Sequence, residues 1–358
     1  MAAVCLITLP LVPGSLTERS PQLDRARLVR ELVPPPRFDA ERFSTYRPDP
    51  AQPSQAEAVR RLEAYAAGLG ERRGGGLLGR LRRGNGDGDG RGIYLDGGFG
   101  VGKTHLLASL WHAAPGPKAF GTFVEYTNLV GALGFQQTVE ALSDHRLVCI
   151  DEFELDDPGD TVLMATLLAR LAEAGVSLAA TSNTLPDALG EGRFAAEDFL
   201  REIQALSARF DVLTVNGPDY RHRDAVDSPP PLPEDEVRAA TAEDEALLDH
   251  FVDVTRHLST VHPSRYRAML EGVSAMGWTH VRQVTDQAVA LRLVVLVDRL
   301  YDARIPVYAS GLPLGEVFGG DMLRGGYRKK YYRAISRLTA LARPDEHWRA
   351  STGPVGPA

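Results

Sequence analysis

The sequence predicts an α/β fold in which a central parallel β-sheet is covered by helices on both faces. From Ile93 onward, short apolar runs that suit buried strands alternate with segments of helical periodicity. A glycine-rich segment joins the first run to the first helix of this region, and an acidic pair follows a later run. Strands that alternate with helices are typical of parallel sheets, because each crossover places a helix on one face of the sheet.

The elements are assigned in chain order from these patterns. A leading amphipathic helix is expected over Gln52–Gly68, where Val59, Leu62 and Ala66 share one face. The strands predicted after it are Ile93–Leu95, Leu147–Ile150, Val176–Ala180, Val212–Val215 and Pro306–Ala309. The helices predicted after it are Lys103–Ala113, Thr161–Ala174, Phe199–Phe210, Glu245–Leu258, Ala288–Asp302 and Lys330–Ala342.

Composition shifts divide the chain into four segments. Residues 1–91 form an N-terminal helical segment that ends in a glycine- and arginine-rich loop, Glu71–Gly92, interpreted as a solvated insertion. Residues 92–225 form the α/β core, 226–246 a Pro-rich acidic linker, and 247–345 a C-terminal α/β segment. The C-terminal segment is expected to be mixed α/β.

The overall composition indicates a soluble cytoplasmic protein. The chain has 358 residues, of which 44% are hydrophobic and 24% charged, and a net charge of −7 argues against a nucleic-acid footprint over its whole length. Its two cysteines, Cys5 and Cys149, fit neither a disulfide scaffold nor a zinc site, so a reducing cytosol is expected. The apolar stretch Ala2–Leu16 lacks the preceding positive charge of a signal peptide, and no stretch reaches the length of a membrane span.

A glycine-rich motif, GGFGVGKT, matches the phosphate-binding pattern GxxxxGK[ST] in full. Such a P-loop needs small residues because its backbone N–H groups must closely approach the phosphates of a nucleotide. Lys103 would reach the β- and γ-phosphates, and the Thr104 hydroxyl would bind Mg²⁺. The predicted nucleotide-contacting residues are Gly97, Gly98, Phe99, Gly100, Val101, Gly102, Lys103, Thr104 and His105.

An acidic pair, Asp151 and Glu152, ends the apolar run of RLVCIDEF. We expect Asp151 to hold Mg²⁺ through its water shell and Glu152 to polarise the attacking water. This run lies 48 positions after Lys103, on a strand that can neighbour the strand entering the P-loop. The pair could instead cap the next helix, but its combination with the P-loop favours the catalytic interpretation.

A polar strand end, Thr181–Asn183, follows the third predicted strand. Asn183 is predicted to orient the attacking water between the γ-phosphate and Glu152. The alternative is that Asn183 caps a helix that begins near Pro186.

Arg209 lies in LSARFDVLTV, at the end of a predicted helix. We predict that it projects toward the γ-phosphate bound by a neighbouring subunit and stabilises the transition state, which would require a homo-oligomer. The alternative is a helix C-terminal cation that interacts favourably with the helix dipole. Arg221 and Arg223 are rival candidates for the trans-acting arginine.

Other classes of P-loop protein fit these residues less well. No lysine follows an asparagine, so the NKxD guanine-specificity motif of GTPases is absent, and so is the LSGGQ signature of transporter ATPases. A small-molecule kinase would not need a glutamate directly after Asp151. Hydrolysis of ATP, with Mg²⁺ as cofactor, is therefore the predicted reaction.

Taken together, the P-loop, the DEF acidic pair and the TSN strand end resemble those of AAA+ ATPases, which have a three-layer P-loop NTPase core around a parallel sheet. More narrowly, the chain resembles the cell division protein ZapE family, which also includes mitochondrial Afg-one-like ATPases. The resemblance runs from about Gln52 to Leu341. It rests on the blocks SQAEAVRRLEAY, VCIDEFELDD, MATLLARL, GVSLAATSNTLPDAL, DYRHR, LVDRLYD and RAISRL.

The resemblance adds candidate residues to the nucleotide site. It implies that Arg292 or Arg337 senses the γ-phosphate, and that Gln55 approaches the edge of the adenine. Lys103, Thr104, Asp151, Glu152 and Asn183 match the family positions that bind or hydrolyse the nucleotide.

The resemblance also implies a biological role. Members of the family are division-associated ATPases that act on the tubulin-like division GTPase, FtsZ, and mitochondrial relatives are linked to protein quality control. The sequence therefore predicts a cytoplasmic ATPase, recruited to the division site, that remodels a protein partner. The glycine- and arginine-rich insertion and the Pro-rich linker depart from the family pattern, and this bears on the partner because partner contacts usually lie on variable loops.

A nucleic-acid-associated ATPase of the helicase-loader type is the alternative, since such proteins share the same core. Its contact surfaces would be the arginine-rich loop Arg72–Arg83 and the basic helix Tyr327–Arg337.

Overall fold

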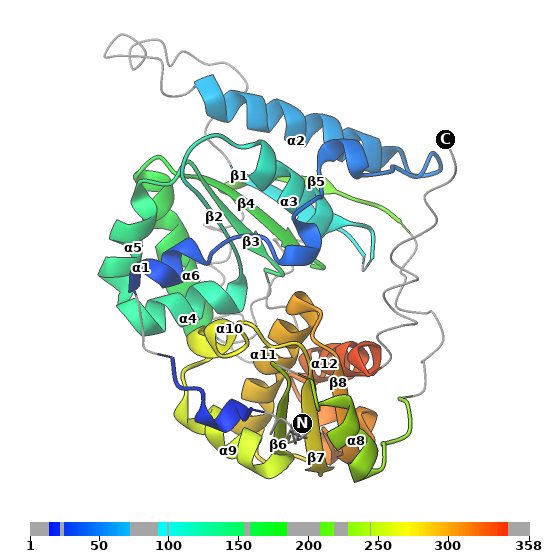
Figure 1. Cartoon of the computed structure of the whole chain (residues 1–358). Coiled ribbons are helices and arrows are strands. Elements are labelled where there is room, and N and C mark those ends of the chain that lie inside the picture. Colours follow the sequence, from blue (N-terminus) through cyan, green and yellow to red (C-terminus); the bar gives the residue numbers. More distant parts are fainter. Residues whose placement is uncertain are drawn as a thin grey trace, which may run out of the picture. The chain divides into compact units, whose positions relative to one another are not determined.

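The computed structural model divides the chain into two compact units. The P-loop unit comprises residues 24–224, and the C-terminal unit comprises residues 225–358 together with residues 1–23 (Figure 1). The structure describes residues 14–21, 25–71, 92–98, 100–153, 158–184, 208–217, 228–243 and 245–342. Each unit has its own sheet and its own buried core.

The P-loop unit is built on a five-stranded parallel sheet in the order β2-β3-β4-β1-β5. Its strands are β1 (Gly92–Asp96), β2 (Lys118–Thr122), β3 (Leu147–Asp151), β4 (Ser177–Ser182) and β5 (Phe210–Thr214). Its helices are α1 (Arg25–Arg30), α2 (Pro53–Glu71), α3 (Lys103–Ala113), α4 (Phe123–Leu133), α5 (Phe135–Ser143) and α6 (Pro158–Glu173), with 3₁₀ turns η2 (Pro36–Phe38) and η3 (Phe43–Thr45).

Both faces of this sheet are buried, which confirms the predicted three-layer core. Along β3, Leu147 and Cys149 face a cluster shared with α2 and α3, whereas Val148 and Ile150 face a cluster shared with α4 and α6. Alternate residues of a strand point to opposite faces, so a strand buried on both sides reads as the continuous apolar run seen in the sequence.

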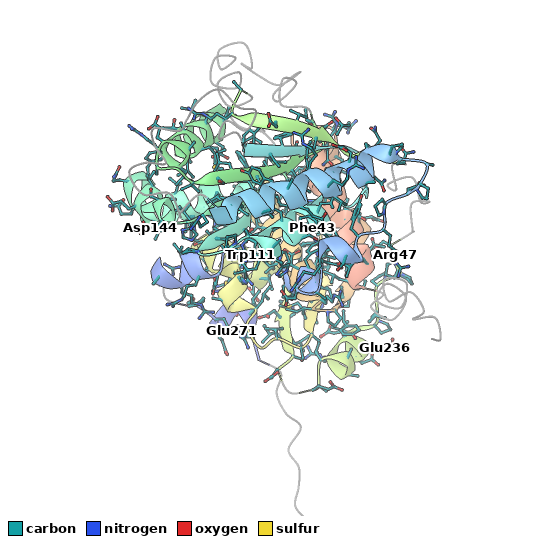
Figure 2. All side chains as sticks on the ribbon, turned by 90° about the horizontal axis from the view of Figure 1, so that it is seen from above. Phe43, Arg47, Trp111, Asp144, Glu236 and Glu271 are labelled. Atoms are coloured by element: carbon teal, nitrogen blue, oxygen red, sulfur yellow. The ribbon has the colours of Figure 1, made fainter. Side chains whose placement is uncertain are left out.

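The predicted N-terminal segment 1–91 is not a separate domain. Residues 25–71 belong to the P-loop unit, where Leu62 of α2 is fully buried and Phe120 of β2 donates a backbone hydrogen bond to Leu32 (2.8 Å). Phe43 of η3 and Trp111 of α3, both labelled in Figure 2, pack against the cluster that α2 and α3 cover. Apolar side chains of this segment complete the core, which explains why it joins the sheet. The glycine- and arginine-rich loop lies outside the described residues.

The C-terminal unit contains a three-stranded parallel sheet in the order β6-β7-β8. Its strands are β6 (Leu247–His250), β7 (Met276–Val281) and β8 (Val307–Gly311). Its helices are α8 (Glu234–Ala240), α9 (Phe251–Thr260), α10 (Tyr266–Met269), α11 (Gln287–Ala303) and α12 (Arg328–Leu341), with 3₁₀ turns η1 (Leu16–Glu18), η8 (Pro263–Arg265), η9 (Leu314–Glu316) and η10 (Gly320–Leu323). All its strand pairs are parallel, and helices alternate with the strands, so the segment contains both α and β elements as predicted.

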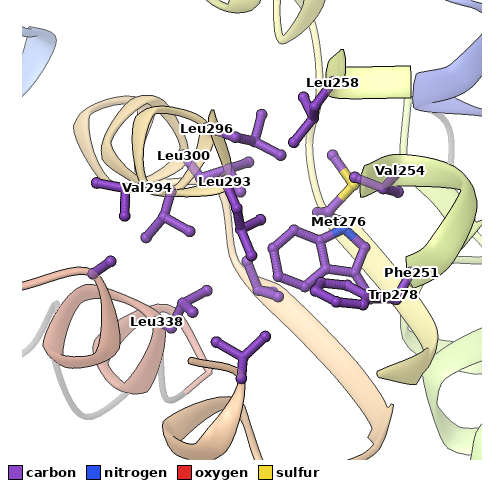
Figure 3. Close-up of a cluster of buried hydrophobic side chains, with 14 of the residues drawn as sticks. Phe251, Val254, Leu258, Met276, Trp278, Leu293, Val294, Leu296, Leu300 and Leu338 are labelled. Atoms are coloured by element: carbon purple, nitrogen blue, oxygen red, sulfur yellow. The ribbon is translucent and has the colours of Figure 1, made fainter. Parts of the chain in front are cut away.

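The core of the C-terminal unit is organised around Trp278 of β7. This side chain is fully buried and meets Phe251 of α9 edge to face, at 5.5 Å between ring centroids (Figure 3). Leucines and valines of α11 and Leu338 of α12 close the same cluster (Figure 3). No helix among the described residues combines the length and the apolar character needed to cross a membrane.

Two predictions for the C-terminal half are wrong. The helix expected over Glu245–Leu258 begins only at Phe251, because β6 precedes it and Glu245 has a left-handed φ of 69°. The Pro-rich stretch 226–246 is not a free linker from residue 228 onward. It contains α8, whose Val237 is fully buried, and Leu232 N–H donates to Ala309 O of β8 (2.8 Å).

Candidate active site

The P-loop connects β1 to α3, as the sequence predicts. Gly102 caps α3 in a left-handed conformation (φ 89°), so its backbone demands a glycine. A Cβ atom at Gly97 would lie 2.3 Å from Val215 O, so the backbone approach there leaves no room for a side chain. Phe99 lies outside the described residues. The N–H groups at the start of α3 point outward from the helix end, where they suit an anion.

Lys103 joins the P-loop to the end of β4. Its side chain is buried, and Nζ donates to Gly97 O (2.8 Å), Gly98 O (2.6 Å) and Asn183 Oδ1 (2.8 Å). The lysine and the asparagine that the sequence assigns to the nucleotide site are therefore in direct contact. An ammonium held by neutral carbonyl and amide oxygens can exchange these partners for phosphate oxygens, which bind it more strongly.

Thr104 and Asp151 also meet directly. The Thr104 hydroxyl donates to both carboxylate oxygens of Asp151, at 3.1 and 3.0 Å. Thr181 of β4 donates its hydroxyl to the same carboxylate, at 2.5 Å from Oδ1. A hydroxyl and a carboxylate are hard oxygen donors of the kind that Mg²⁺ prefers, so this donor set fits the predicted metal.

Burial, and to a smaller extent the charge of neighbouring Glu152, raise the pKa of Asp151 to about 6. The hydrogen bonds from Thr181 and Thr104, and then the positive charge of Arg37, act in the opposite direction. Bringing a cation to this carboxylate would remove the penalty, because an adjacent positive charge favours the ionised form.

Glu152 stands in an uncommon backbone conformation. Its φ is 53°, in the left-handed region that non-glycine residues rarely adopt. Two hydrogen bonds to Thr181 hold the turn: Glu152 N–H donates to the hydroxyl (3.1 Å), and Phe153 N–H donates to the carbonyl (2.7 Å). Strain of this kind persists where the surroundings fix it, and here it sets the direction in which the Glu152 side chain leaves the strand.

The expectation that the Asp151 strand could neighbour the P-loop strand is wrong, because β4 lies between β3 and β1. The predicted site residues still meet although β4 separates the two strands, for a geometric reason. Parallel strands end at the same edge of the sheet, and Thr104 on α3 reaches across to Asp151. The intervening strand supplies Thr181 and Asn183, which contact Asp151 and Lys103 respectively.

Two further residues predicted to contact the nucleotide are engaged with the protein itself. Both ring nitrogens of His105 contact the segment before α2: Nε2 lies 3.1 Å from Thr45 Oγ1, and Nδ1 lies 3.2 Å from a Glu41 carboxylate oxygen. Gln55 is buried; its side-chain carbonyl accepts from Asp49 N–H (2.8 Å) and its amide donates to Asn216 O (2.8 Å). Contact of either side chain with a nucleotide stays a prediction.

Arg209 lies far from the P-loop of its own chain. Its carbonyl accepts from Gly92 N–H (2.7 Å), which places it beside the first residue of β1, while the P-loop follows the last. The five residues of β1 span about 16 Å, so Arg209 is remote from the P-loop of its own chain, and its role at the site of a neighbouring subunit stays a prediction. Arg221, Arg223 and the helix predicted over Phe199–Phe210 lie outside the described residues, apart from the last three positions of that helix.

The two candidate sensor arginines are held within the C-terminal unit. Arg292 of α11 donates to Leu258 O (2.8 Å) and Val261 O (2.9 Å) at the end of α9. Arg337 of α12 pairs with Asp298 of α11, which Arg333 also contacts at 3.1 Å. These contacts give both arginines a structural role, and sensing of the γ-phosphate stays a prediction.

Sequence reasoning overlooked Thr181 and Arg37 as contributors to this site. Thr181 lies two residues before Asn183, so strand periodicity could have placed the two on one face. Arg37 is more than 100 positions before Asp151 in the sequence and belongs to no motif, so nothing in the sequence links the two. Only the folded chain brings its charge near the carboxylate.

The chain matches the sequence model described as AFG1-like ATPase, over residues 23–236 and 231–349. It is 27% identical over 296 residues to the cell division protein ZapE of Escherichia coli K12, an alignment that covers 70% of this chain and 78% of the relative. An uncharacterized protein of Schizosaccharomyces pombe is 30% identical over 150 residues, which cover 37% of this chain and 33% of that protein.

Solved structures with a similar fold are more distant. The crystal structure of DnaI is 16% identical, with a TM-score of 0.40 and coverage of 53% of this chain and 98% of that one. The replication initiator DnaA, bound to AMPPCP and single-stranded DNA, is 11% identical, with a TM-score of 0.38 and coverage of 87% of this chain and 95% of that one.

Proposed function

The chain belongs to the AFG1-like ATPase family, and we propose that it hydrolyses Mg·ATP in order to remodel a protein partner. Hydrolysis of ATP follows from the family. The metal, the roles of individual residues and the partner are our proposal. It is supported mainly by one observation: two hydrogen-bonded groups, Lys103 with Asn183 and Thr104 with Asp151, meet at the carboxyl ends of β1, β3 and β4.

The residues divide the work of hydrolysis as follows. Lys103 leaves its carbonyl partners for the β- and γ-phosphates and neutralises charge as the terminal phosphoryl group departs. Glu152 polarises the attacking water, and its fixed backbone limits the positions that its carboxylate can reach. Asn183 orients the same water from β4.

Thr104 and Asp151 are the proposed ligands of Mg²⁺, with Asp151 acting directly or through the water shell. A magnesium ion there would neutralise the phosphate oxygens and favour the inline displacement. The two residues already lie within hydrogen-bonding distance, so the ion would replace the Thr104–Asp151 contact rather than require a new arrangement of strands.

Replacing Glu152 by Gln tests the assignment of the water-activating residue. The variant should bind ATP with wild-type affinity and lose at least about 100-fold in kcat, the usual scale for loss of a general base. Glu140→Gln is a matched control, since Glu140 lies on α5 of the same unit and accepts a hydrogen bond from the exposed side chain of Gln136. Wild-type turnover by Glu152→Gln would remove Glu152 from this role.

We propose that the active form is a homo-oligomer in which Arg209 stabilises the transition state in the neighbouring site. Arg209→Ala and Glu152→Gln should each be inactive alone. A mixture should recover part of the activity, because some sites then combine an intact Glu152 with the partner's intact Arg209. No recovery, together with a specific activity that does not change on dilution, would argue for catalysis within one subunit.

The proposed biological setting is bacterial cell division, since the relative from Escherichia coli is named a cell division protein. The proposed target is the tubulin-like division GTPase, with the ATPase acting in the cytoplasm at the division site. Light scattering by GTP-dependent polymers of that GTPase should change when the chain and ATP are added together. Glu152→Gln should bind the polymers without remodelling them; polymers unaffected by the wild-type chain would exclude this target.

The helicase-loader alternative has weaker support from the described residues. Two residues of the basic helix proposed as its contact surface, Arg333 and Arg337, form ion pairs with Asp298. The arginine-rich loop Arg72–Arg83 lies outside the described residues. Salt-dependent DNA binding and stimulation of ATP turnover by DNA would favour this alternative over protein remodelling.

A further inference from the structure

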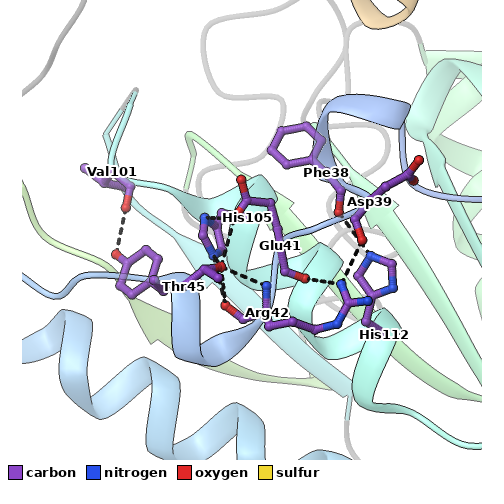
Figure 4. A network of polar contacts seen from close by, with 9 residues as sticks. Phe38, Asp39, Glu41, Arg42, Thr45, Val101, His105 and His112 are labelled. Atoms are coloured by element: carbon purple, nitrogen blue, oxygen red, sulfur yellow. Dashed lines mark hydrogen bonds and ion pairs between the residues drawn. The ribbon is translucent and has the colours of Figure 1, made fainter. Parts of the chain in front are cut away.

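The segment before α2, residues 41–46, contacts the P-loop and the first turn of α3. Figure 4 shows Glu41 and Thr45 of this segment gathered around His105. The Tyr46 hydroxyl donates to Val101 O at 2.8 Å. No motif marks this segment in the sequence, and the predicted site residues do not include Tyr46.

The contact with Val101 fixes the orientation of one peptide group in the P-loop. In a planar trans peptide, the carbonyl and the following N–H point in opposite directions. Because Val101 O points at Tyr46, the N–H of Gly102 points away from Tyr46. A phosphate cradle depends on such N–H groups facing inward, and rotation of this peptide would turn one of them out.

The ring of Tyr46 adds a steric constraint. A Cβ atom at Gly102 would lie 2.6 Å from the ring, so the ring rests against the Gly102 backbone. Tyr46 also meets His105 edge to face, at 5.3 Å between ring centroids. Burial of the hydroxyl raises the pKa of Tyr46 to about 12, so the phenol stays protonated and able to donate at physiological pH.

A second anchor holds the same segment to the first turn of α3. Glu41 accepts from the Thr45 hydroxyl (2.9 Å) and pairs with His105 Nδ1 (3.2 Å), while His105 Nε2 lies 3.1 Å from both Thr45 Oγ1 and Arg42 O. His105 directly follows Thr104, the last residue of the P-loop motif. The segment therefore holds the P-loop on both sides of Gly102, through Val101 before it and His105 after it.

We propose that Tyr46 is a positioning residue for ATP: it holds the Val101–Gly102 peptide in the orientation that binds phosphate, with Glu41 and His105 as a supporting anchor. The inference rests on the proposed function, because it assumes that this loop binds the triphosphate. Tyr46 acts through the loop and does not itself contact the reacting atoms. Its loss should weaken the binding of any ligand that uses the phosphate cradle.

The test compares Tyr46→Phe with Tyr65→Phe. Tyr65 of α2 lies in the same unit, is also half-buried, and also donates to a backbone carbonyl, Leu178 O at 3.2 Å. Tyr46→Phe keeps the ring and should raise the KM for ATP and the dissociation constants of ATP and ADP about fivefold to tenfold, the scale of one hydrogen bond. The kcat should stay within about twofold, and Tyr65→Phe should leave all these values unchanged.

Inorganic tripolyphosphate, measured by competition with a labelled nucleotide, separates an effect on the loop from an effect on the base. Tyr46→Phe should weaken tripolyphosphate as much as ATP. Weakening of ATP alone, unchanged binding by Tyr46→Phe, or an equal loss in Tyr65→Phe would each overturn the inference. If Tyr46→Phe does not fold, the inference is tested with Glu41→Gln. The affinities of this variant for ATP and for tripolyphosphate should fall together by about twofold to threefold. Wild-type affinities would overturn the inference. A wild-type chain that neither binds nor hydrolyses Mg·ATP would instead refute the proposed function.

Discussion

Replacing Thr181 by Val removes one hydroxyl from the centre of the proposed site. Thr181 is 2% exposed, and valine has nearly the same shape, so the change leaves no cavity. The hydroxyl donates to Asp151 Oδ1 at 2.5 Å and accepts from Glu152 N–H at 3.1 Å. Both acidic residues of the proposed mechanism therefore lose a partner at once.

The magnitude follows from the charge on Asp151. A hydrogen bond to a charged group contributes about 1.5–3 kcal/mol, and about 1.4 kcal/mol corresponds to a tenfold change in proton affinity. The bond from Thr181 lowers the pKa of Asp151, which burial has raised to about 6. Its loss should raise that pKa further, so Asp151 would be largely protonated at neutral pH and a cation would have to displace the proton.

The assay is ATP turnover titrated with Mg²⁺ at several pH values. Thr181→Val should need about twofold to tenfold more Mg²⁺ than the wild type for half-maximal turnover at pH 7. The deficit should shrink as the pH rises toward 8.5, because Asp151 then ionises without help. Lower kcat at saturating Mg²⁺ is also expected, since the Glu152 turn loses a tether.

Thr138→Val is the matched control. Thr138 is fully buried in the same unit, and its hydroxyl donates to Gly134 O at 2.8 Å, away from the proposed site. Both variants should lower the melting temperature, but only Thr181→Val should shift the Mg²⁺ requirement. Identical Mg²⁺ and pH profiles in the two variants would refute the reasoning that links Thr181 to Asp151.

Three further predictions concern backbone strain and buried charge. Glu152→Gly should be more stable than Glu152→Ala by about 1 kcal/mol in chemical unfolding, since only glycine adopts a φ of 53° without strain. Both variants should lack ATP turnover. Equal stabilities would contradict the presence of backbone strain. Gly102→Ala should lose detectable ATP binding, because φ 89° disfavours a side chain there; wild-type affinity in calorimetry would count against the loop geometry. Burial alone would raise the pKa of Asp298, but Arg337 and Arg333 hold that pKa below its ordinary value. The charged form of Asp298 therefore stabilises the folded state at any pH above the pKa of the unfolded chain. This stabilisation is lost as the pH falls through the lower pKa of the folded chain. Asp298→Asn should therefore cost about 3 kcal/mol at pH 7, with the difference from wild type narrowing below about pH 4; a pH-independent difference would show that the charge is not the cause.

Local patterns predicted the elements whose sequences carry one unambiguous period. The helix expected over Lys103–Ala113 has those bounds in the structure, because the P-loop glycines fix its start. The prediction failed at Leu247–His250, where two leucines before Phe251 extend the apparent helical period although they form a strand. β7 was missed altogether, since Gly277, Thr279 and His280 interrupt its apolar run.

The site shows a similar division between what a motif contains and what strand order decides. Lys103, Thr104 and Asp151 could be assigned because their residue types suit phosphate and Mg²⁺. That β4 would lie between β3 and β1 could not be read from the sequence, since strand order depends on how the crossover helices pack. The contact of Tyr46 with the P-loop is harder still to predict, because a tyrosine 55 positions before Val101 has no characteristic spacing to that loop.

The position of β4 gives this site a property that neither motif has by itself. Thr181 and Asn183 lie two residues apart, and they contact the two halves of the site: Thr181 binds Asp151 and the Glu152 backbone, and Asn183 binds Lys103. In the mechanism proposed above, Asn183 would lose this partner when Lys103 turns to the phosphates, and its side chain could then bind the water that Glu152 is proposed to polarise. In the proposed mechanism, occupancy of the P-loop and orientation of the water would be coupled through the end of β4, because a triphosphate that binds Lys103 would release the side chain of Asn183.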